Sequence, residues 1–121
     1  MITINLDNVK DIMKEVSRVM DENKDYLVEL DSKAGDGDLG ISMSSGFRAV
    51  LESDAMKKQN LKKFLMASGM VINEASPSSL GTIIFMGMIA GAKNIGDAET
   101  LDAVEIGKFF MAACPKQWST S

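Results

Sequence analysis

The sequence predicts an all-α protein, built as one antiparallel bundle of about six helical segments. Over most of the 121 residues, apolar side chains recur three and four positions apart, which is the spacing that places them on one face of a helix. No alternating run of β-branched residues reaches the length of a strand. Hydrophobic residues make up 45% and charged residues 25% of the chain, a globular composition that suffices for one modest core.

Two helical segments are expected before residue 32. Asp7 or Asn8 can cap the first, because short polar side chains accept hydrogen bonds from the free amides of a helix start. Its apolar stripe consists of Val9, Ile12, Met13, Val16, Val19 and Met20. A shorter segment follows Asn23 and ends near Asp31. Its apolar residues are Tyr26, Leu27 and Leu30.

Two further helices are expected between residues 41 and 75. The apolar side chains of the first are Met43, Phe47, Val50 and Leu51. Gly46 inside this helix costs about 1 kcal/mol relative to alanine, so we interpret it as a point where another helix approaches closely. Asn60 can cap the second helix, and Pro77 ends the region because proline disfavours helix at the residue before it. The stripe of the second helix is Leu61, Phe64, Leu65, Met66, Val71 and Ile72.

The next predicted helix begins at Ser78 or Ser79 and is apolar on nearly all sides, which predicts burial between several neighbours. We expect its most buried residues to be Ile83, Ile84, Phe85 and Met88. After a loop at residues 94–99, Thr100 can cap a last helix that Pro115 ends. The apolar residues of this helix are Leu101, Val104, Phe109 and Phe110. Residues 1–114 then form the domain, and residues 115–121 form a tail.

Composition argues against several classes of function. The chain has no histidine, which excludes Ser-His-Asp chemistry and histidine-ligated zinc. A single cysteine, Cys114, forms no intramolecular disulfide and fits a reducing cytoplasm. The net charge of -4 argues against nucleic-acid binding, and we expect no membrane span because no run of eighteen apolar residues occurs. The acidic start MITINLDNVKD does not resemble a secretory signal.

The segment DSKAGDGDLG, residues 31–40, contains three aspartates and three glycines. Neighbouring carboxylates repel one another unless they are solvated, protonated or bridged by a cation, and glycine allows the backbone to wrap around such a cation. Hard oxygen ligands favour magnesium, calcium or manganese, so Asp31, Asp36 and Asp38 are candidate metal ligands. From spacing alone, a solvated turn with aspartates as helix caps is an equally good interpretation.

Familiar motifs do not account for this loop. Gly35, Gly37 and Gly40 match the dinucleotide pattern G-x-G-x-x-G, but no buried strand precedes them. An EF-hand would need a closing glutamate where Ser42 or Phe47 stands. No Gly-Lys-Ser/Thr of a phosphate-binding P-loop follows a glycine-rich turn.

Two helix starts are suited to a phosphate. Free backbone N–H groups at residues 40–42 can bind phosphate oxygens beside a magnesium ion on the aspartates. The segment SPSSLGT, residues 76–82, is a second small-residue turn that opens a helix. For a single turn of this kind, simple N-capping by serine is the commoner explanation.

These motifs occur together in one known family. The segment LDSKAGDGDLGISMSSGF, residues 30–47, resembles the signature of the ADP-binding L subunit of bacterial dihydroxyacetone kinases, in which an aspartate precedes a GD-x-D-x-G loop and a Met and Gly-Phe follow. The later segments SGM and SPSSLGT stand in the family's order, and the resemblance covers residues 7–113. It implies a barrel of antiparallel helices that holds a nucleotide at one end.

The resemblance also implies a site and a reaction. Paired magnesium ions would be bound by Asp31, Asp36 and Asp38. ADP or ATP would be contacted by Leu39, Gly40, Ile41, Ser42, Ser78 and Ser79. A phospho-donor protein of the phosphotransferase system would rephosphorylate the bound ADP, and a partner K subunit would hold dihydroxyacetone on its own histidine. No side chain of this chain would act as a catalytic group.

The sequence departs from the family at two points. Leu39 stands where many members carry histidine, and the family's later helices, which include a lid over the nucleotide, have no counterpart here. We therefore expect an incomplete bundle that self-associates through Met86, Met88, Phe109, Phe110 and Met111. Two other functions stay open: a non-catalytic interaction module, and a related kinase domain for another substrate.

Overall fold

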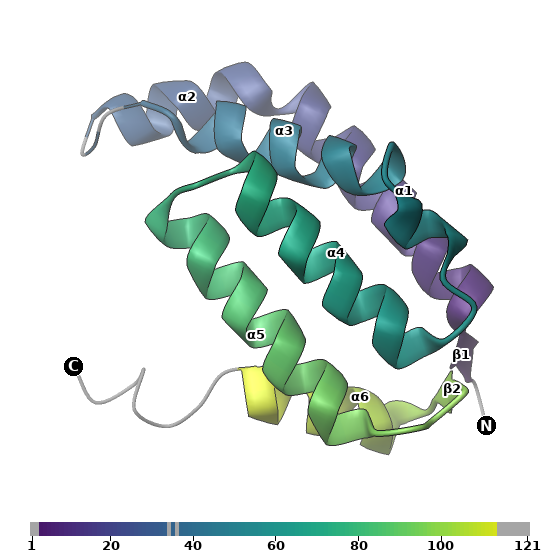
Figure 1. Cartoon of the computed structure of the whole chain (residues 1–121). Coiled ribbons are helices and arrows are strands. Elements are labelled where there is room, and N and C mark those ends of the chain that lie inside the picture. The colour runs from purple at the N-terminus through teal and green to yellow at the C-terminus, as the bar shows by residue number, and fades with distance from the viewer. Residues whose placement is uncertain (1–2, 34, 36, 114–121) are drawn as a thin grey trace.

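A computed structural model describes residues 3–33, 35 and 37–113, and most of this part of the chain is helical (Figure 1). The helices are α1 Leu6–Glu22, α2 Lys24–Ser32, α3 Leu39–Leu51, α4 Leu61–Ala75, α5 Ser79–Ile95 and α6 Ala103–Ala113, with a short 3-10 helix, η1 Asp54–Lys57. Two short strands, β1 Ile4–Asn5 and β2 Thr100–Leu101, complete the elements. The prediction of an all-α fold with about six helical segments is confirmed.

The helices pack in chain order. Helix α3 contacts α1, α2 and α4, while α5 contacts α4 on one side and α6 on the other. In Figure 1, α3 runs back beside α1 and α2, and α4 and α5 continue the alternation of direction. As a result, the loop between α2 and α3 lies at the same end of the bundle as the turn between α4 and α5.

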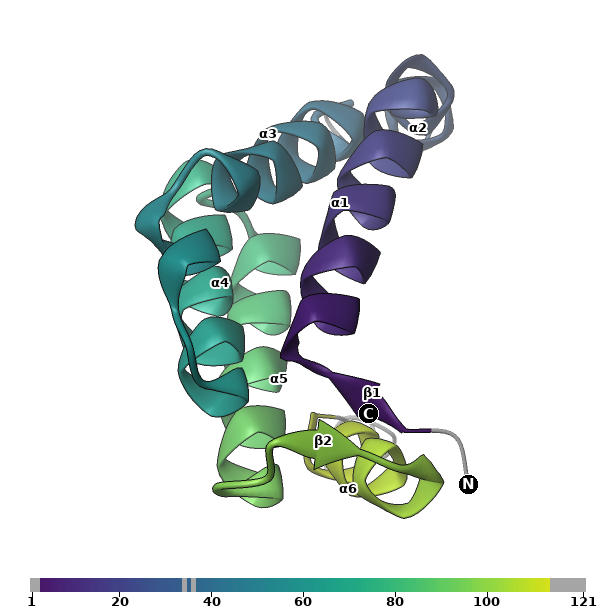
Figure 2. The ribbon, with the colours of Figure 1, turned by 90° about the vertical axis from the view of Figure 1, so that its right-hand side faces the viewer.

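A small antiparallel sheet joins the two ends of this row of helices. Ile4 pairs with Leu101 and Asn5 pairs with Thr100, so β1 and β2 hold the start of α1 beside the start of α6 (Figure 2). The prediction that Thr100 caps the last helix and that Leu101 lies within it is therefore wrong. Asp102 is the residue that accepts a hydrogen bond from the α6 start, from the backbone N–H of Glu105 at 2.9 Å. Strands of two residues are too short to show an alternating pattern in the sequence.

Side-chain caps fix most of the other helix starts. Asn60 accepts a hydrogen bond from the backbone N–H of Lys63 at 3.0 Å, which confirms the predicted cap of α4. Ser78 caps α5. Helix α1 begins earlier than expected, because its cap is Asn5 rather than Asp7 or Asn8.

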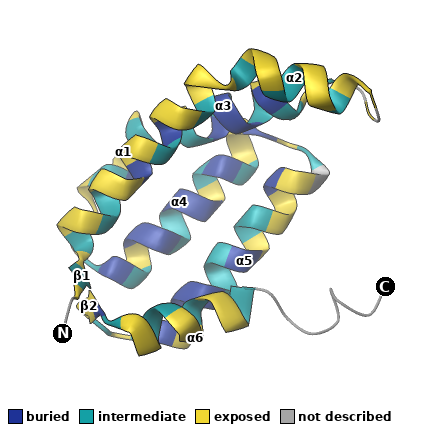
Figure 3. Cartoon of the chain, turned by 180° about the vertical axis from the view of Figure 1, so that it is seen from behind, coloured by how far each residue is buried: buried dark blue, intermediate teal, exposed yellow. Residues whose placement is uncertain are grey.

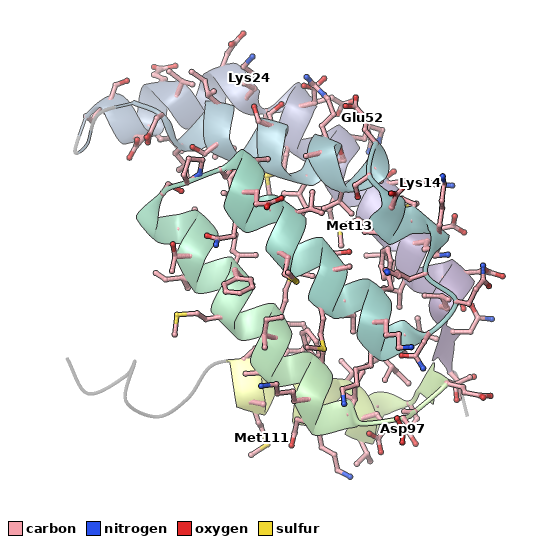
Figure 4. The ribbon with its side chains drawn as sticks, in the orientation of Figure 1. Met13, Lys14, Lys24, Glu52, Asp97 and Met111 are labelled. Carbon is pink, nitrogen blue, oxygen red and sulfur yellow. The ribbon has the colours of Figure 1, made fainter. Side chains whose placement is uncertain are left out.

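The core is centred on α4, whose inner face is buried along its length (Figure 3). Phe64 and Ile72 of this helix are fully buried. Met13 points from α1 into the interior (Figure 4). The remaining buried apolar residues are Met43, Val50, Ala55, Leu61, Leu65, Ala92, Ile95 and Leu101. No helix in the described part of the chain is long and apolar enough to cross a membrane.

The predicted burial of α5 is wrong. Ile83 is 47% exposed, and Ile84, Phe85 and Met88 are only partly buried. The buried residues of this helix are instead Gly81, Gly87, Gly91, Ala92 and Ile95, of which only Ile95 is large. Apart from Ile95, its large side chains are partly covered or exposed, although the helix is apolar nearly all round.

Candidate functional site

The α2–α3 loop and the α4–α5 turn lie at the same end of the bundle (Figure 1). A polar pocket of about 420 Å³ opens between residues of these two segments. Its lining residues are Asp31, Asp38, Leu39, Ser42, Pro77, Ser78 and Leu80. The aspartate loop and the serine turn, which are separated by α3 and α4 in the sequence, thus form two walls of one pocket. We call them the aspartate wall (residues 31–42) and the serine wall (residues 76–82).

Asp31 lies near the end of α2 and organises the aspartate wall. Its Oδ2 atom accepts hydrogen bonds from the backbone N–H groups of Gly37 at 3.0 Å and Leu39 at 3.3 Å. Its backbone carbonyl accepts a further bond from the N–H of Gly35 at 2.6 Å. Gly37 has a φ of 82°, in the left-handed region that favours glycine, and a Cβ there would lie 2.7 Å from Ser32 Oγ. The loop therefore wraps around one carboxylate, which also faces the pocket.

The other two predicted metal ligands are Asp38, which the structure describes, and Asp36, which it does not. Asp38 is the N-cap residue of α3, makes no side-chain cap hydrogen bond and lines the pocket. Asp36 lies outside the described residues. Among the residues that the structure does describe, no three acidic side chains are grouped as metal ligands. Convergence of Asp31, Asp36 and Asp38 on a common centre therefore stays a prediction.

The first turn of α3 divides into residues that face the pocket and residues that do not. Leu39 and Ser42 line the pocket. Gly40 is buried against α2, where a Cβ would clash with the carbonyl oxygen of Lys24 and lie 2.9 Å from a methyl carbon of Val28. Ile41 is 51% exposed and is not a lining residue. Gly40 thus allows α3 to start close to α2.

The serine wall is the start of α5 together with the turn before it. Ser78 lines the pocket, and its Oγ accepts a hydrogen bond from the backbone N–H of Gly81 at 3.0 Å. Ser79 is the first residue of α5, and its side chain is not among those described. Pro77 and Leu80 also line the pocket, but the sequence marked Pro77 only as a helix break and Leu80 not at all.

The polar groups of this pocket fit a cation–phosphate complex better than a bare phosphate. Carboxylates of Asp31 and Asp38 would repel a bare phosphate, whereas a divalent cation between them would neutralise that charge. The starts of α3 and α5 add backbone N–H groups and the positive ends of helix dipoles. A volume of about 420 Å³ lies within the range of small-molecule pockets.

Known proteins share these segments. The family model described as DAK2 domain matches residues 33–120, which include all of both walls except Asp31 and Ser32. The ADP-binding subunit DhaL of PEP-dependent dihydroxyacetone kinase 2 from Listeria innocua is 34% identical to this chain over 64 residues. That match covers 50% of this chain and 30% of the relative, so it spans less than a third of the relative's length.

Proposed function

Since the chain belongs to the DAK2 domain family, we propose that it binds magnesium and ADP as a nucleotide-carrying part of a dihydroxyacetone kinase. The observation that supports this function best is the joining of the aspartate loop and the serine turn in one polar pocket. The relative from Listeria innocua is itself named an ADP-binding subunit.

Each wall of the pocket would have a separate task. Asp31, Asp36 and Asp38 would hold the magnesium ions, which when bound supply charge neutralisation between the carboxylates and the phosphates. Backbone N–H groups at the starts of α3 and α5 would take the remaining phosphate oxygens, near Ser42, Ser78 and Ser79. Gly40 and Ile41 would contribute through their backbone, since their side chains do not line the pocket.

The chain would take part in phosphoryl transfer without supplying a nucleophile. The terminal phosphoryl group of bound ATP would pass to a hydroxyl of dihydroxyacetone on a K-type partner subunit, which would accept the hydroxyl proton, and ADP would stay in the pocket. A phospho-donor protein of the phosphotransferase system would then restore ATP. The absence of histidine from the sequence agrees with an acceptor held by another subunit, and we assign this exchange to the cytoplasm.

Calorimetric titration with ADP, in the presence and absence of magnesium, tests this function. We expect magnesium-dependent binding, and we expect Asp36→Asn to weaken it at least about tenfold, the lower end of what loss of a supporting group costs a metal site. The thermal midpoint should change little, because the predicted role of Asp36 is in binding. Asp54→Asn is the matched control, since Asp54 lies on η1 outside the pocket and pairs with Lys57 at the surface.

Two outcomes would contradict the proposal. A folded chain that binds no ADP at millimolar magnesium would favour the alternative of a non-catalytic interaction module. A fall in thermal stability for Asp36→Asn as large as the fall in affinity would mean that the loop is structural. Titration of the ADP complex with K-type subunits loaded with different substrates separates dihydroxyacetone from the acceptor of a related kinase.

A further inference from the structure

Ser76 is the first residue of the serine wall, but it does not line the pocket. It is the residue at which α4 ends, it is 2% exposed, and its backbone N–H donates to the carbonyl of Ile72 at 2.8 Å. An unpaired buried hydroxyl is destabilising, so the partner of the Ser76 hydroxyl matters for the stability of this region.

The Ser76 hydroxyl donates a hydrogen bond to the backbone carbonyl of Ser42, in the first turns of α3. Gly46, one helical turn after Ser42, leaves the space for this contact. A Cβ at Gly46 would lie 2.9 Å from Ser76 Oγ and 3.3 Å from a methyl carbon of Ile72. The expected close approach at Gly46 is therefore confirmed, and the approaching groups belong to the end of α4.

The backbone carbonyl of Ser76 contacts the rest of the serine wall. It accepts a hydrogen bond from the Ser78 hydroxyl at 3.3 Å, and the same Ser78 oxygen accepts from the N–H of Gly81 at 3.0 Å. A Cβ at Gly81 would clash with this carbonyl, so glycine allows the first turn of α5 to lie against Ser76.

These bonds form one continuous series between the walls. On the side of α3, the N–H of Ser42 donates to the carbonyl of Asp38 at 2.9 Å, and the carbonyl of Ser42 accepts from Ser76. On the side of α5, the series continues from Ser76 through Ser78 to Gly81. The Ser76 hydroxyl is the one side-chain link in it that crosses from α3 to the serine turn.

We infer that Ser76 is a positioning residue that fixes the separation of the aspartate wall and the serine wall. A nucleotide whose phosphates meet both walls needs this separation to be set before it binds, whereas a metal ion held by the aspartates needs one wall only. The effect on the nucleotide rests on the proposed function, but the packing of Ser76 against α3 does not.

Ser76→Ala tests the inference against a matched variant of the same helix. Ser68 of α4 is also fully buried, and within the part of the chain that the structure describes its hydroxyl has no hydrogen-bond partner. Ser68→Ala therefore removes the same atom without cutting a link between the walls. With calorimetry we expect Ser76→Ala to raise the Kd for magnesium-ADP about fivefold, the change that one net hydrogen bond makes. Ser68→Ala should leave this Kd unchanged.

Binding of the metal ion alone distinguishes a positioning role of Ser76 from a general loss of stability, because a general loss would weaken metal and nucleotide binding alike. Binding of Mn²⁺, followed by electron paramagnetic resonance, should be the same in the natural chain, Ser76→Ala and Ser68→Ala. Ser76→Cys, whose thiol is a weaker donor of similar size, should give a Kd for magnesium-ADP between those of the natural chain and Ser76→Ala. Equal losses of Mn²⁺ and ADP affinity in Ser76→Ala, or equal effects of Ser76→Ala and Ser68→Ala, would overturn the inference.

A double-mutant cycle tests the same contact without any ligand. Gly46→Ala should lower the urea midpoint, and in the Ser76→Ala background it should lower the midpoint by at most half as much, because the nearest atom to the new Cβ is gone. Additive effects would mean that Ser76 does not hold the serine turn on α3, whatever the ligand. Coupling in a chain that binds no ADP would contradict the proposed function and leave the positioning role of Ser76 in the fold supported.

Discussion

Two asparagines determine where α1 begins. The backbone N–H of Asn8 donates to the side-chain oxygen of Asn5 at 2.9 Å, and the N–H of Asn5 donates to the side-chain oxygen of Asn8 at 3.0 Å. This reciprocal pair satisfies two amides that the helix itself leaves without acceptors. Asn5 also belongs to β1, so the same residue ends the strand and starts the helix.

Asn5→Ala is therefore expected to reduce the free energy of unfolding by about 1 kcal/mol, the usual cost of losing an N-cap. Asp7→Ala should cost less, because Asp7 contributes only a charge in the first turn. Urea denaturation of both variants measures the difference. A larger loss for Asp7→Ala would show that the cap lies where the sequence pattern alone had placed it.

The sequence predicts a helix cap or a side-chain hydrogen bond only where neighbouring residues determine it. Asn60 and Ser78 could be predicted as caps because each stands directly before an apolar helix. Asn5 could not be distinguished from its neighbours, since its position depends on pairing with Thr100 at the other end of the domain. The link between Ser76 and Ser42 spans 34 positions and has no motif, so the sequence indicated the serine turn but not the role of its first residue.

At the scale of elements, α5 and α6 pack closely because α5 presents glycines to α6. A Cβ at Gly91 would lie 2.6 Å from ring atoms of Phe109, whereas a Cβ at Gly87 would lie 3.4 Å from the carbonyl oxygen of Ala113. Hydrophobic periodicity shows how apolar a helix is, but it does not show which side carries the neighbours. This is why the sequence predicted burial for the large residues of α5 and missed the small ones.

Gly91→Ala and Gly87→Ala should change stability in opposite directions. Alanine favours a helix interior by up to about 1 kcal/mol over glycine, and this gain should dominate at position 87, where the added methyl group has room. At position 91 overpacking against Phe109 should outweigh the gain, with a net loss of about 1–2 kcal/mol. Thermal and urea unfolding provide the measurement, and a stabilised Gly91→Ala variant would mean that α6 shifts freely on α5.

At the scale of the whole molecule, an apolar groove of about 170 Å³ remains open between α1, α4 and α6. Its lining residues are Ile4, Val9, Ile12, Leu65, Leu101, Ile106, Phe109 and Phe110. Phe110 is 60% exposed and Met111 is 78% exposed, and Met111 points away from the bundle (Figure 4). Of the residues expected to mediate self-association, Met88 and Phe109 are partly buried, while Met86, Phe110 and Met111 are exposed.

The charges of α6 do not oppose a second copy of the chain as the occupant of this groove. Glu105 and Lys108 are the charged residues of α6, and they pair with each other at 3.5 Å. The helix therefore presents no net charge, so two copies of a chain with a net charge of -4 could meet there without strong repulsion. A two-fold arrangement would place the exposed Phe110 and Met111 of each copy against the groove of the other.

Sedimentation velocity at micromolar concentration should accordingly show a dimer for the natural chain and a monomer for Met111→Asp. A carboxylate buried in an apolar interface without a partner costs well over 1.4 kcal/mol, so the dimer Kd should rise more than about tenfold. Met70→Asp is the control, because Met70 is 56% exposed on α4 and is not one of the residues that line the groove. A natural chain that stays monomeric, or a Met70→Asp variant that dissociates as readily as Met111→Asp, would contradict an interface built on α6.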